Sequence, residues 1–228
     1  MTIGLRLSAA GSAKRSHGLG SLSPGVPRAA PASMGTVRPR AGSAGLRQTP
    51  GMDHRDHVRL IREGVEGAGP SWADLGSGEG AFTLALADVL GQGGSIISVD
   101  RDAGALAVLA RTMRGRFPDV ALTTLQADFS QSLDLPPLDG IVMANSLHFS
   151  RDKLPVLRLV RAHLRPGGRL ILVEYDADRG NPWVPHPLSF RAWRALADEA
   201  GFRLERHDVA LHGVCRDCVG RPAEAAGR

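Results

Sequence analysis

The chain of 228 residues contains only two cysteines, Cys215 and Cys218. Two thiols do not make a disulfide framework, so we expect a protein of a reducing compartment such as the cytoplasm. The pair has the spacing of metal ligands, with His207 and His212 nearby. A structural zinc site needs four ligands, however, and no second cysteine pair follows. We therefore interpret the cysteines as ordinary thiols and expect no metal.

Long apolar runs are also missing. No segment approaches the roughly 20 apolar residues of a membrane-spanning helix, and the first residues lack the apolar region of a secretory signal. Hydrophobic residues make up 43% and charged residues 22% of the chain, as in an ordinary globular protein. We expect one domain with a buried core and no membrane partner.

Acidic residues are absent from the first 52 positions, which hold seven Lys or Arg. All 23 acidic residues follow from Asp53 onward, against 21 Lys or Arg there. The net charge of +5 therefore divides into a leader of +7 and a body of −2. Because the body has no basic excess, the sequence gives no strong indication of a nucleic-acid partner.

The leader, residues 1–51, is rich in Gly, Ser, Ala, Pro and Arg and has no sustained apolar periodicity. Such a segment buries too little surface to offset the entropy of ordering, so we expect disorder. It could be a transit peptide, a nucleic-acid-binding arm, or sequence upstream of a native start at Met52. We favour the third interpretation, and place the folded domain at residues 52–228.

The body alternates between strand-like and helix-like segments. Apolar patterns predict strands near residues 72–75, 95–99, 121–127, 140–144, 169–174 and 202–209. Helices are expected near residues 53–65, 81–90, 102–114, 152–164 and 189–200, with Asp102 and Ser189 as N-caps and Gly115 as a stop. This alternation predicts a doubly wound, mostly parallel Rossmann-like sheet with helices on both faces.

Three glycines at alternate positions, Gly76, Gly78 and Gly80, follow the first of these strands. Glycines in a strand-to-helix turn allow a ligand to approach the backbone closely. Polar residues end the next three strands, namely Asp100, Asp128 and Asn145. Because the carboxyl ends of parallel strands meet at one edge of a sheet, these residues should surround one crevice.

Five blocks resemble the class I S-adenosylmethionine-dependent methyltransferases. They are Asp74-Leu-Gly-Ser-Gly-Glu-Gly80, Asp100, Gln126-Ala-Asp128-Phe129, the segment from Asp139 to His148, and the segment from Leu164 to Glu174 with its Arg-Pro-Gly-Gly turn. The blocks occur in the family's order over residues 72–208. A dinucleotide-binding oxidoreductase would instead show Gly-x-Gly-x-x-Gly, so we regard an NAD(P)-dependent oxidoreductase as the weaker alternative.

The resemblance implies S-adenosylmethionine as cofactor and a role for each matching residue. Asp74 would hold the cofactor's amino group, Asp100 its ribose hydroxyls and Asp128 its adenine amine. Asn145 would lie near the sulfonium and the acceptor. The other implied cofactor contacts are Gly76, Ser77, Gly78, Gly80, Arg101 and Phe129.

Methyl transfer requires alignment of the nucleophile, carbon and sulfur, and a general base only where the acceptor must lose a proton. His148 is a candidate base or substrate contact, or else a loop histidine or partial core residue. The residues from Glu174 to Asp176 end the fifth strand at the same rim, and the plainer interpretation is that they are solvated there. The segment 181–187, rich in proline and containing Trp183, could form a substrate lid or a plain connection.

The sequence departs from the family at its carboxyl end. The family sheet ends with a seventh, antiparallel strand, but residues 211–228 lack strand-like alternation, so we expect that strand to be poorly formed or missing. The Asn-Pro-Pro-aromatic signature of base and glutamine methyltransferases is absent after the fourth strand. We therefore expect a small-molecule methyltransferase, the alternative being a non-catalytic S-adenosylmethionine-binding module.

Overall fold

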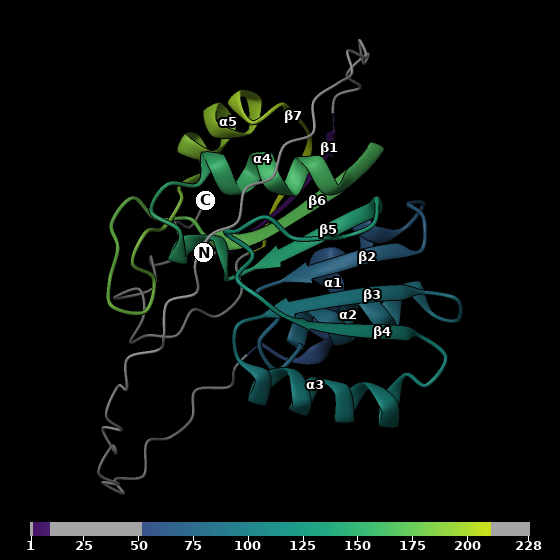
Figure 1. Cartoon of the computed structure of the whole chain (residues 1–228). Coiled ribbons are helices and arrows are strands. Elements are labelled where there is room, and N and C mark those ends of the chain that lie inside the picture. The colour runs from purple at the N-terminus through teal and green to yellow at the C-terminus, as the bar shows by residue number, and fades with distance from the viewer. Residues whose placement is uncertain (1, 10–51, 211–228) are drawn as a thin grey trace, which may run out of the picture.

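The computed structural model describes residues 2–9 and 52–210, which form an α/β fold (Figure 1). Its strands are β1 (Thr2–Ala9), β2 (Ser71–Leu75), β3 (Ser95–Asp100), β4 (Ala121–Gln126), β5 (Leu138–Ala144), β6 (Leu164–Tyr175) and β7 (Phe202–Ala210). Its helices are α1 (His54–Val65), α2 (Ala81–Leu90), α3 (Ala103–Arg116), α4 (Leu154–His163), α5 (Phe190–Glu199) and the short 3₁₀ helix η1 (Leu147–Phe149). The expected alternation of strands and helices is confirmed.

Several helix ends follow from local capping. The Asp102 carboxylate accepts hydrogen bonds from the backbone N–H groups of Gly104 and Ala105, and Ser189 caps α5 through the N–H of Ala192. The prediction that Gly115 stops its helix was wrong, because α3 continues to Arg116. Glycine at this position has open space around it and fits within the helix, so it does not force an end.

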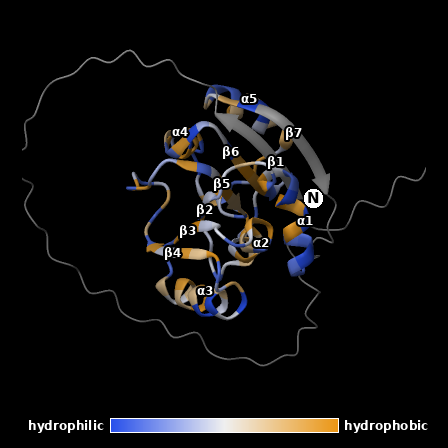
Figure 2. Cartoon of the chain, turned by 90° about the vertical axis from the view of Figure 1, so that its right-hand side faces the viewer, coloured by the Kyte–Doolittle hydropathy of each residue, from blue (hydrophilic) through white to orange (hydrophobic). Residues whose placement is uncertain are grey.

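The strands form one sheet in the order β4-β3-β2-β5-β6-β1-β7. The first five strands of that order pair in parallel with their neighbours, while β1 is antiparallel to both β6 and β7. Two hydrophobic clusters cover the two faces, one with α4 and α5 and the other with α1, α2 and α3. Figure 2 shows this layering from the side. The predicted Rossmann-like fold is confirmed.

One part of the sheet differs from the prediction. The place between β6 and β7 is occupied by β1 from the start of the chain. Residues 211–228, where we expected a poorly formed or missing seventh strand, lie outside the described residues. Residues Thr2 to Ser8 pair with residues Tyr175 to Arg169 of β6, and β1 pairs with β7 on its other side. The prediction of disorder is therefore corrected for residues 2–9, because an open β6 edge provides unpaired backbone groups that a short extended segment can satisfy.

The rest of the leader, residues 10–51, and the tail with Cys215 and Cys218 lie outside the described residues. Met52 as the native start and the boundary at residue 52 stay predictions. No helix within the described ranges is long and apolar enough to cross a membrane.

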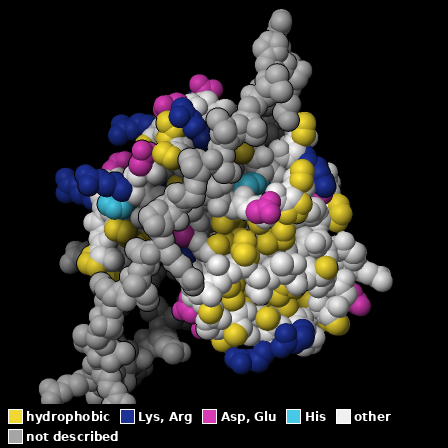
Figure 3. Space-filling model, viewed as in Figure 1, with side chains coloured by type: hydrophobic (Ala, Val, Ile, Leu, Met, Phe, Trp, Pro, Cys, Tyr) yellow, Lys and Arg dark blue, Asp and Glu magenta, His cyan; other side chains and the backbone are white. Residues whose placement is uncertain are grey.

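The face of the sheet that carries α4 and α5 is covered unevenly. A loop, residues 127–137, connects β4 to β5, and Leu133 and Leu135 in this loop pack partly buried against the hydrophobic cluster. Figure 3, drawn from the same side as Figure 1, shows hydrophobic side chains at the surface of this face. Leu133 and Leu135 thus extend the hydrophobic cluster on this face.

Candidate functional site

The glycine loop after β2 needs glycine for steric reasons. All three glycines have positive φ angles, of 79° at Gly76, 52° at Gly78 and 90° at Gly80. A Cβ at Gly76 would lie 2.5 Å from the Cβ of Ser146, and a Cβ at Gly80 would clash with Leu109 Cδ1. At Gly78 nothing lies within 4 Å of an added Cβ. The loop is thus tightly packed on two sides and open at its centre.

Asp100, at the end of β3, contacts this loop directly. The backbone N–H of Gly78 donates to Asp100 Oδ2 at 2.8 Å, and the N–H of Asp102 donates to Oδ1 at 2.9 Å. The structure therefore joins the predicted ribose-binding carboxylate to the centre of the glycine loop. This is the arrangement expected where two strand ends meet at one edge of a parallel sheet.

Asp128 lies two residues beyond the end of β4. Its Oδ1 accepts hydrogen bonds from the backbone N–H and hydroxyl of Ser130, and Oδ2 lies 3.8 Å from Arg101 Nη1. The Ser130 hydroxyl, then its N–H, and the Arg101 charge lower the pKa of Asp128 below its usual value. The Oδ2 atom of the ionised carboxylate, which has fewer partners than Oδ1, can accept a hydrogen bond from an amine.

Phe129 and Ser146 border the same loop. A Cβ at Gly76 would lie 3.1 Å from Phe129 Cε1. Ser146 Oγ donates to the carbonyl of Leu75 at 2.7 Å, which joins the end of β5 to the start of the loop. Sequence reasoning missed Ser146, whose only signal was its place after Asn145.

Asp74 does not lie open in the crevice. Its side chain is 1% exposed, and Oδ2 accepts a 2.7 Å hydrogen bond from Thr83 Oγ1, which also contacts Ser98 Oγ. Burial raises the pKa of Asp74 to about 7, while the Thr83 hydrogen bond opposes the rise and the Asp100 charge adds to it. The carboxyl thus lies beneath the first turn of α2, where its charge is costly.

Two buried oxygens near the loop lack partners among the described residues, Ser77 Oγ and Asn145 Oδ1. Asn145 also has a positive φ of 53°, which is uncommon outside glycine. Buried polar atoms normally have hydrogen-bond partners, and strained backbone concentrates at functional sites. These two oxygens, the open centre of the loop and the Asp100 carboxylate fit a polar cofactor such as S-adenosylmethionine.

His148 and Glu174 form a buried pair beside Asn145. Their Nδ1 and Oε2 atoms lie 2.7 Å apart, and both side chains are 3% exposed. The prediction that Glu174 belongs to a solvated rim was wrong, because the backbone N–H groups of Leu147 and His148 require its Oε1 as an acceptor. The signal that could have found it was a charged residue ending a nearly all-apolar strand.

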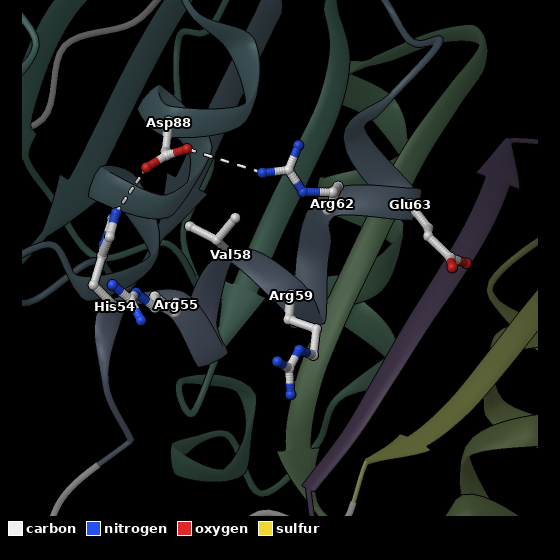
Figure 4. A pocket seen from close by; sticks show the side chains of 7 residues that line it. All are labelled: His54, Arg55, Val58, Arg59, Arg62, Glu63 and Asp88. Carbon is white, nitrogen blue, oxygen red and sulfur yellow. Dashed lines mark hydrogen bonds and ion pairs between the residues drawn. The ribbon is translucent and has the colours of Figure 1, made fainter.

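A separate surface cavity of about 410 Å³ lies against α1 and α2. It is lined by His54, Arg55, Val58, Arg59, Arg62, Glu63 and Asp88, and Asp88 contacts both His54 and Arg62 (Figure 4). None of the predicted site residues is among these lining residues. Among the described residues no cluster of three or more His, Cys, Asp or Glu side chains could hold a metal ion.

Comparisons with known proteins agree with this geometry. Residues 73–170 match the model of a methyltransferase domain family. An arsenite methyltransferase of Aquipseudomonas alcaligenes is 33% identical over 149 residues, which cover 62% of this chain and 37% of that protein. The ubiquinone/menaquinone biosynthesis C-methyltransferase UbiE of Pectobacterium carotovorum is 31% identical over 148 residues, covering 61% and 59%. The chain thus spans less than two thirds of the length of either relative.

Solved structures share the fold. A SAM-dependent methyltransferase from Aquifex aeolicus superposes with a TM-score of 0.55 at 20% identity, covering 66% of this chain and 81% of that chain. The YcgJ protein of Bacillus subtilis superposes with a TM-score of 0.53 at 20% identity, covering 64% and 68%. Together with the motif order, the match of residues 73–170 to a methyltransferase domain family and the shared fold support a class I S-adenosylmethionine-dependent methyltransferase domain in this chain.

Proposed function

We propose that this domain transfers the methyl group of S-adenosylmethionine to a small-molecule acceptor. The observation that carries the proposal is the hydrogen bond between the centre of the glycine loop and Asp100, with the unpartnered Ser77 and Asn145 oxygens nearby. The relatives support a small acceptor, since they are an arsenite methyltransferase and a quinone-biosynthesis C-methyltransferase by name.

The proposed roles follow the positions of the side chains. Asp100 binds the ribose hydroxyls and Asp128 the adenine amine, each as a hydrogen-bond acceptor. The open backbone at Gly78 receives the cofactor, and Ser77 and Asn145 offer oxygens to its polar groups. The bound cofactor supplies an activated methyl group. The protein's contribution is to align the acceptor with that group and exclude water, which accounts for much of the acceleration in such displacements.

Asp74, Arg101 and Phe129 have less direct proposed roles. Asp74 influences the cofactor's amino group from beneath the loop, Arg101 stabilises the ionised Asp128, and Phe129 packs beside the loop near the adenine. The cytoplasmic location expected from the low cysteine content also stays a prediction.

Calorimetry of the full chain with S-adenosylhomocysteine tests the cofactor site. We expect Asp100→Ala to weaken binding more than about tenfold, because it removes charge-assisted hydrogen bonds. Asp134→Ala is the matched control, since Asp134 is an exposed carboxylate that is not among the proposed cofactor contacts. An Asp100→Ala affinity equal to that of wild type would exclude the ribose role, and no binding by folded wild type would exclude the cofactor.

Turnover then separates an enzyme from a binding module. Release of S-adenosylhomocysteine in the presence of small acceptors identifies a methyltransferase. Tight binding of the cofactor with no turnover on any acceptor would favour the non-catalytic alternative.

A further inference from the structure

The buried pair of His148 and Glu174 lies at the same edge of the sheet as the proposed cofactor site. η1, which carries His148, begins directly after Ser146, and Ser146 contacts the start of the glycine loop through the Leu75 carbonyl. Glu174 is the penultimate residue of β6, next to β5 in the sheet. The pair is therefore built by two adjacent strand ends, which is where ligands bind in such folds.

Glu174 has little freedom in the hydrogen bonds it makes. Its Oε1 accepts from the backbone N–H groups of Leu147 and His148, at 2.8 and 3.2 Å, and its Oε2 faces His148 Nδ1 at 2.7 Å. A carboxylate that accepts from all three groups requires the proton on Nδ1. In a neutral imidazole the other nitrogen, Nε2, is then an acceptor. No described residue hydrogen-bonds Nε2.

The groups around the pair do not compete for Nε2. Lys153 donates from Nζ to the Ser150 carbonyl, and burial lowers the pKa of Lys153 while the charges of Glu174 and Asp152 oppose that change. The aromatic rings of Phe149 and Tyr175 flank the imidazole, with centroids at 4.4 and 6.0 Å. The His148 imidazole thus contacts a carboxylate through Nδ1 and aromatic rings on its other sides.

Two exposed aromatic side chains belong to the segments around this pair: Phe149 directly follows His148, and Trp183 lies in the segment after β6. Phe149 is 57% and Trp183 is 61% exposed, and they are the large hydrophobic side chains exposed among the described residues. The Trp183 segment is tied to η1, because the N–H of His186 donates to the His148 carbonyl. Asn181 Oδ1 accepts from the N–H of Trp183, which fixes the local turn. Exposed aromatic surface beside a site indicates an apolar or aromatic ligand.

We propose that Glu174 positions His148 as the general base of the methyl-transfer site, and that the acceptor is an aromatic small molecule with an acidic, phenol-type hydroxyl. The proposal rests on the function proposed above. The hydroxyl gives its proton to His148 Nε2 as the phenolate forms its bond to the methyl carbon. The carbon–sulfur bond breaks, and its electron pair stays on sulfur in S-adenosylhomocysteine. The imidazolium then releases the proton to water.

Nitrogen NMR of the full chain tests the positioning without activity. We expect neutral His148 to carry its proton on Nδ1 in the wild type. Glu174→Gln should shift the tautomer, because the amide can donate to Nδ1 and leave the proton on Nε2. A wild-type His148 protonated on Nε2, or a tautomer unchanged in folded Glu174→Gln, would overturn the positioning role.

Methyl transfer to a series of phenols tests the base and the acceptor class. We expect kcat to fall more than about 100-fold in His148→Gln, with loss of the rise in rate as pH increases, while S-adenosylhomocysteine affinity changes less than about threefold. His163→Gln is the matched control, since His163 lies at the end of α4. Retained kcat in His148→Gln, or bound cofactor with no transfer to any phenol, would overturn the inference. If the folded wild type does not bind S-adenosylhomocysteine, the proposed function is refuted instead.

Discussion

The buried carboxyl of Asp74 should make the stability of the protein depend on pH. The pKa of an aspartate in the unfolded chain lies near its usual value of 3.8, whereas burial raises the pKa of folded Asp74 to about 7. Between these pH values the native state holds a proton that the unfolded chain has released. The free energy of unfolding should therefore fall as the pH rises through this interval.

The size of the effect follows from the shift in pKa. A tenfold change in proton affinity corresponds to about 1.4 kcal/mol, so the rise of the Asp74 pKa from 3.8 to about 7 destabilises the ionised form by at most about 4 kcal/mol. Asp74→Asn removes the charge and keeps an oxygen that can accept from Thr83 Oγ1. We expect the variant to be more stable than wild type at pH 8, and the difference to shrink toward pH 5.

Urea denaturation at several pH values between 5 and 8 measures this difference. The comparison must be made between variants, because burial lowers the pKa of His163, and that group adds stability as pH rises toward its unfolded pKa. Asp134→Asn, at an exposed carboxylate, is the matched control and should follow the wild type. Parallel pH profiles for wild type and Asp74→Asn would refute the reasoning.

Cofactor binding should couple to the same proton. A cationic amino group near the carboxyl favours its ionised form, so S-adenosylhomocysteine should bind wild type more tightly as pH rises from 5.5 to 8. In Asp74→Asn this dependence should flatten. An equally steep pH dependence in both proteins would place the cofactor's amino group away from Asp74.

Other expectations concern the loop and the sheet edge. Gly76→Ala should lower the free energy of unfolding by about 1–3 kcal/mol from strained backbone, because residue 76 has a φ of 79° and the new Cβ would contact Ser146. Thermal melting measures this loss, and an unchanged melting temperature would contradict the prediction. Gly78→Ala places its Cβ in open space, so it should lower the free energy of unfolding by only about 1–2 kcal/mol. The same substitution should weaken S-adenosylhomocysteine binding in calorimetry, and full affinity would show that the cofactor does not contact Gly78. Deletion of residues 2–9 removes the strand between β6 and β7. We expect the free energy of unfolding to fall by more than about 2 kcal/mol, since each backbone hydrogen bond contributes about 1 kcal/mol. An unchanged urea midpoint would show that β1 does not stabilise the sheet.

Much of the fold could be predicted because its signals are local. The caps at Asp102 and Ser189 act on N–H groups two or three residues away, so their sequence patterns are sufficient. The core strands are short apolar runs that end at polar residues, and the parallel arrangement then brings those ends together. The hydrogen bond from Gly78 to Asp100 realises that expectation across 22 residues of sequence.

The features that escaped prediction depend on partners distant in sequence. Glu174 is buried because its oxygens meet donors 26 and 27 residues earlier in the chain. Asp74 is adjacent to the motif, but only the packing of α2 over β2 shows that Thr83 and Ser98 enclose it. The sequence around an acidic residue at a strand end is the same whether its side chain is solvated or paired. Its burial therefore cannot be inferred from the residues next to it in sequence.

The sequence by itself indicated the methyltransferase resemblance, the cofactor and a mostly parallel sheet, because these rest on a glycine loop and strand ends with fixed local geometry. Only the tertiary structure decided that Glu174 pairs with His148, that Asp74 is enclosed, and that β1 lies between β6 and β7. A β-strand contains no signal for its partner, since ladder hydrogen bonds join backbone groups that every residue type except proline possesses. A strand pairs with whichever strand edges the rest of the fold leaves unpaired.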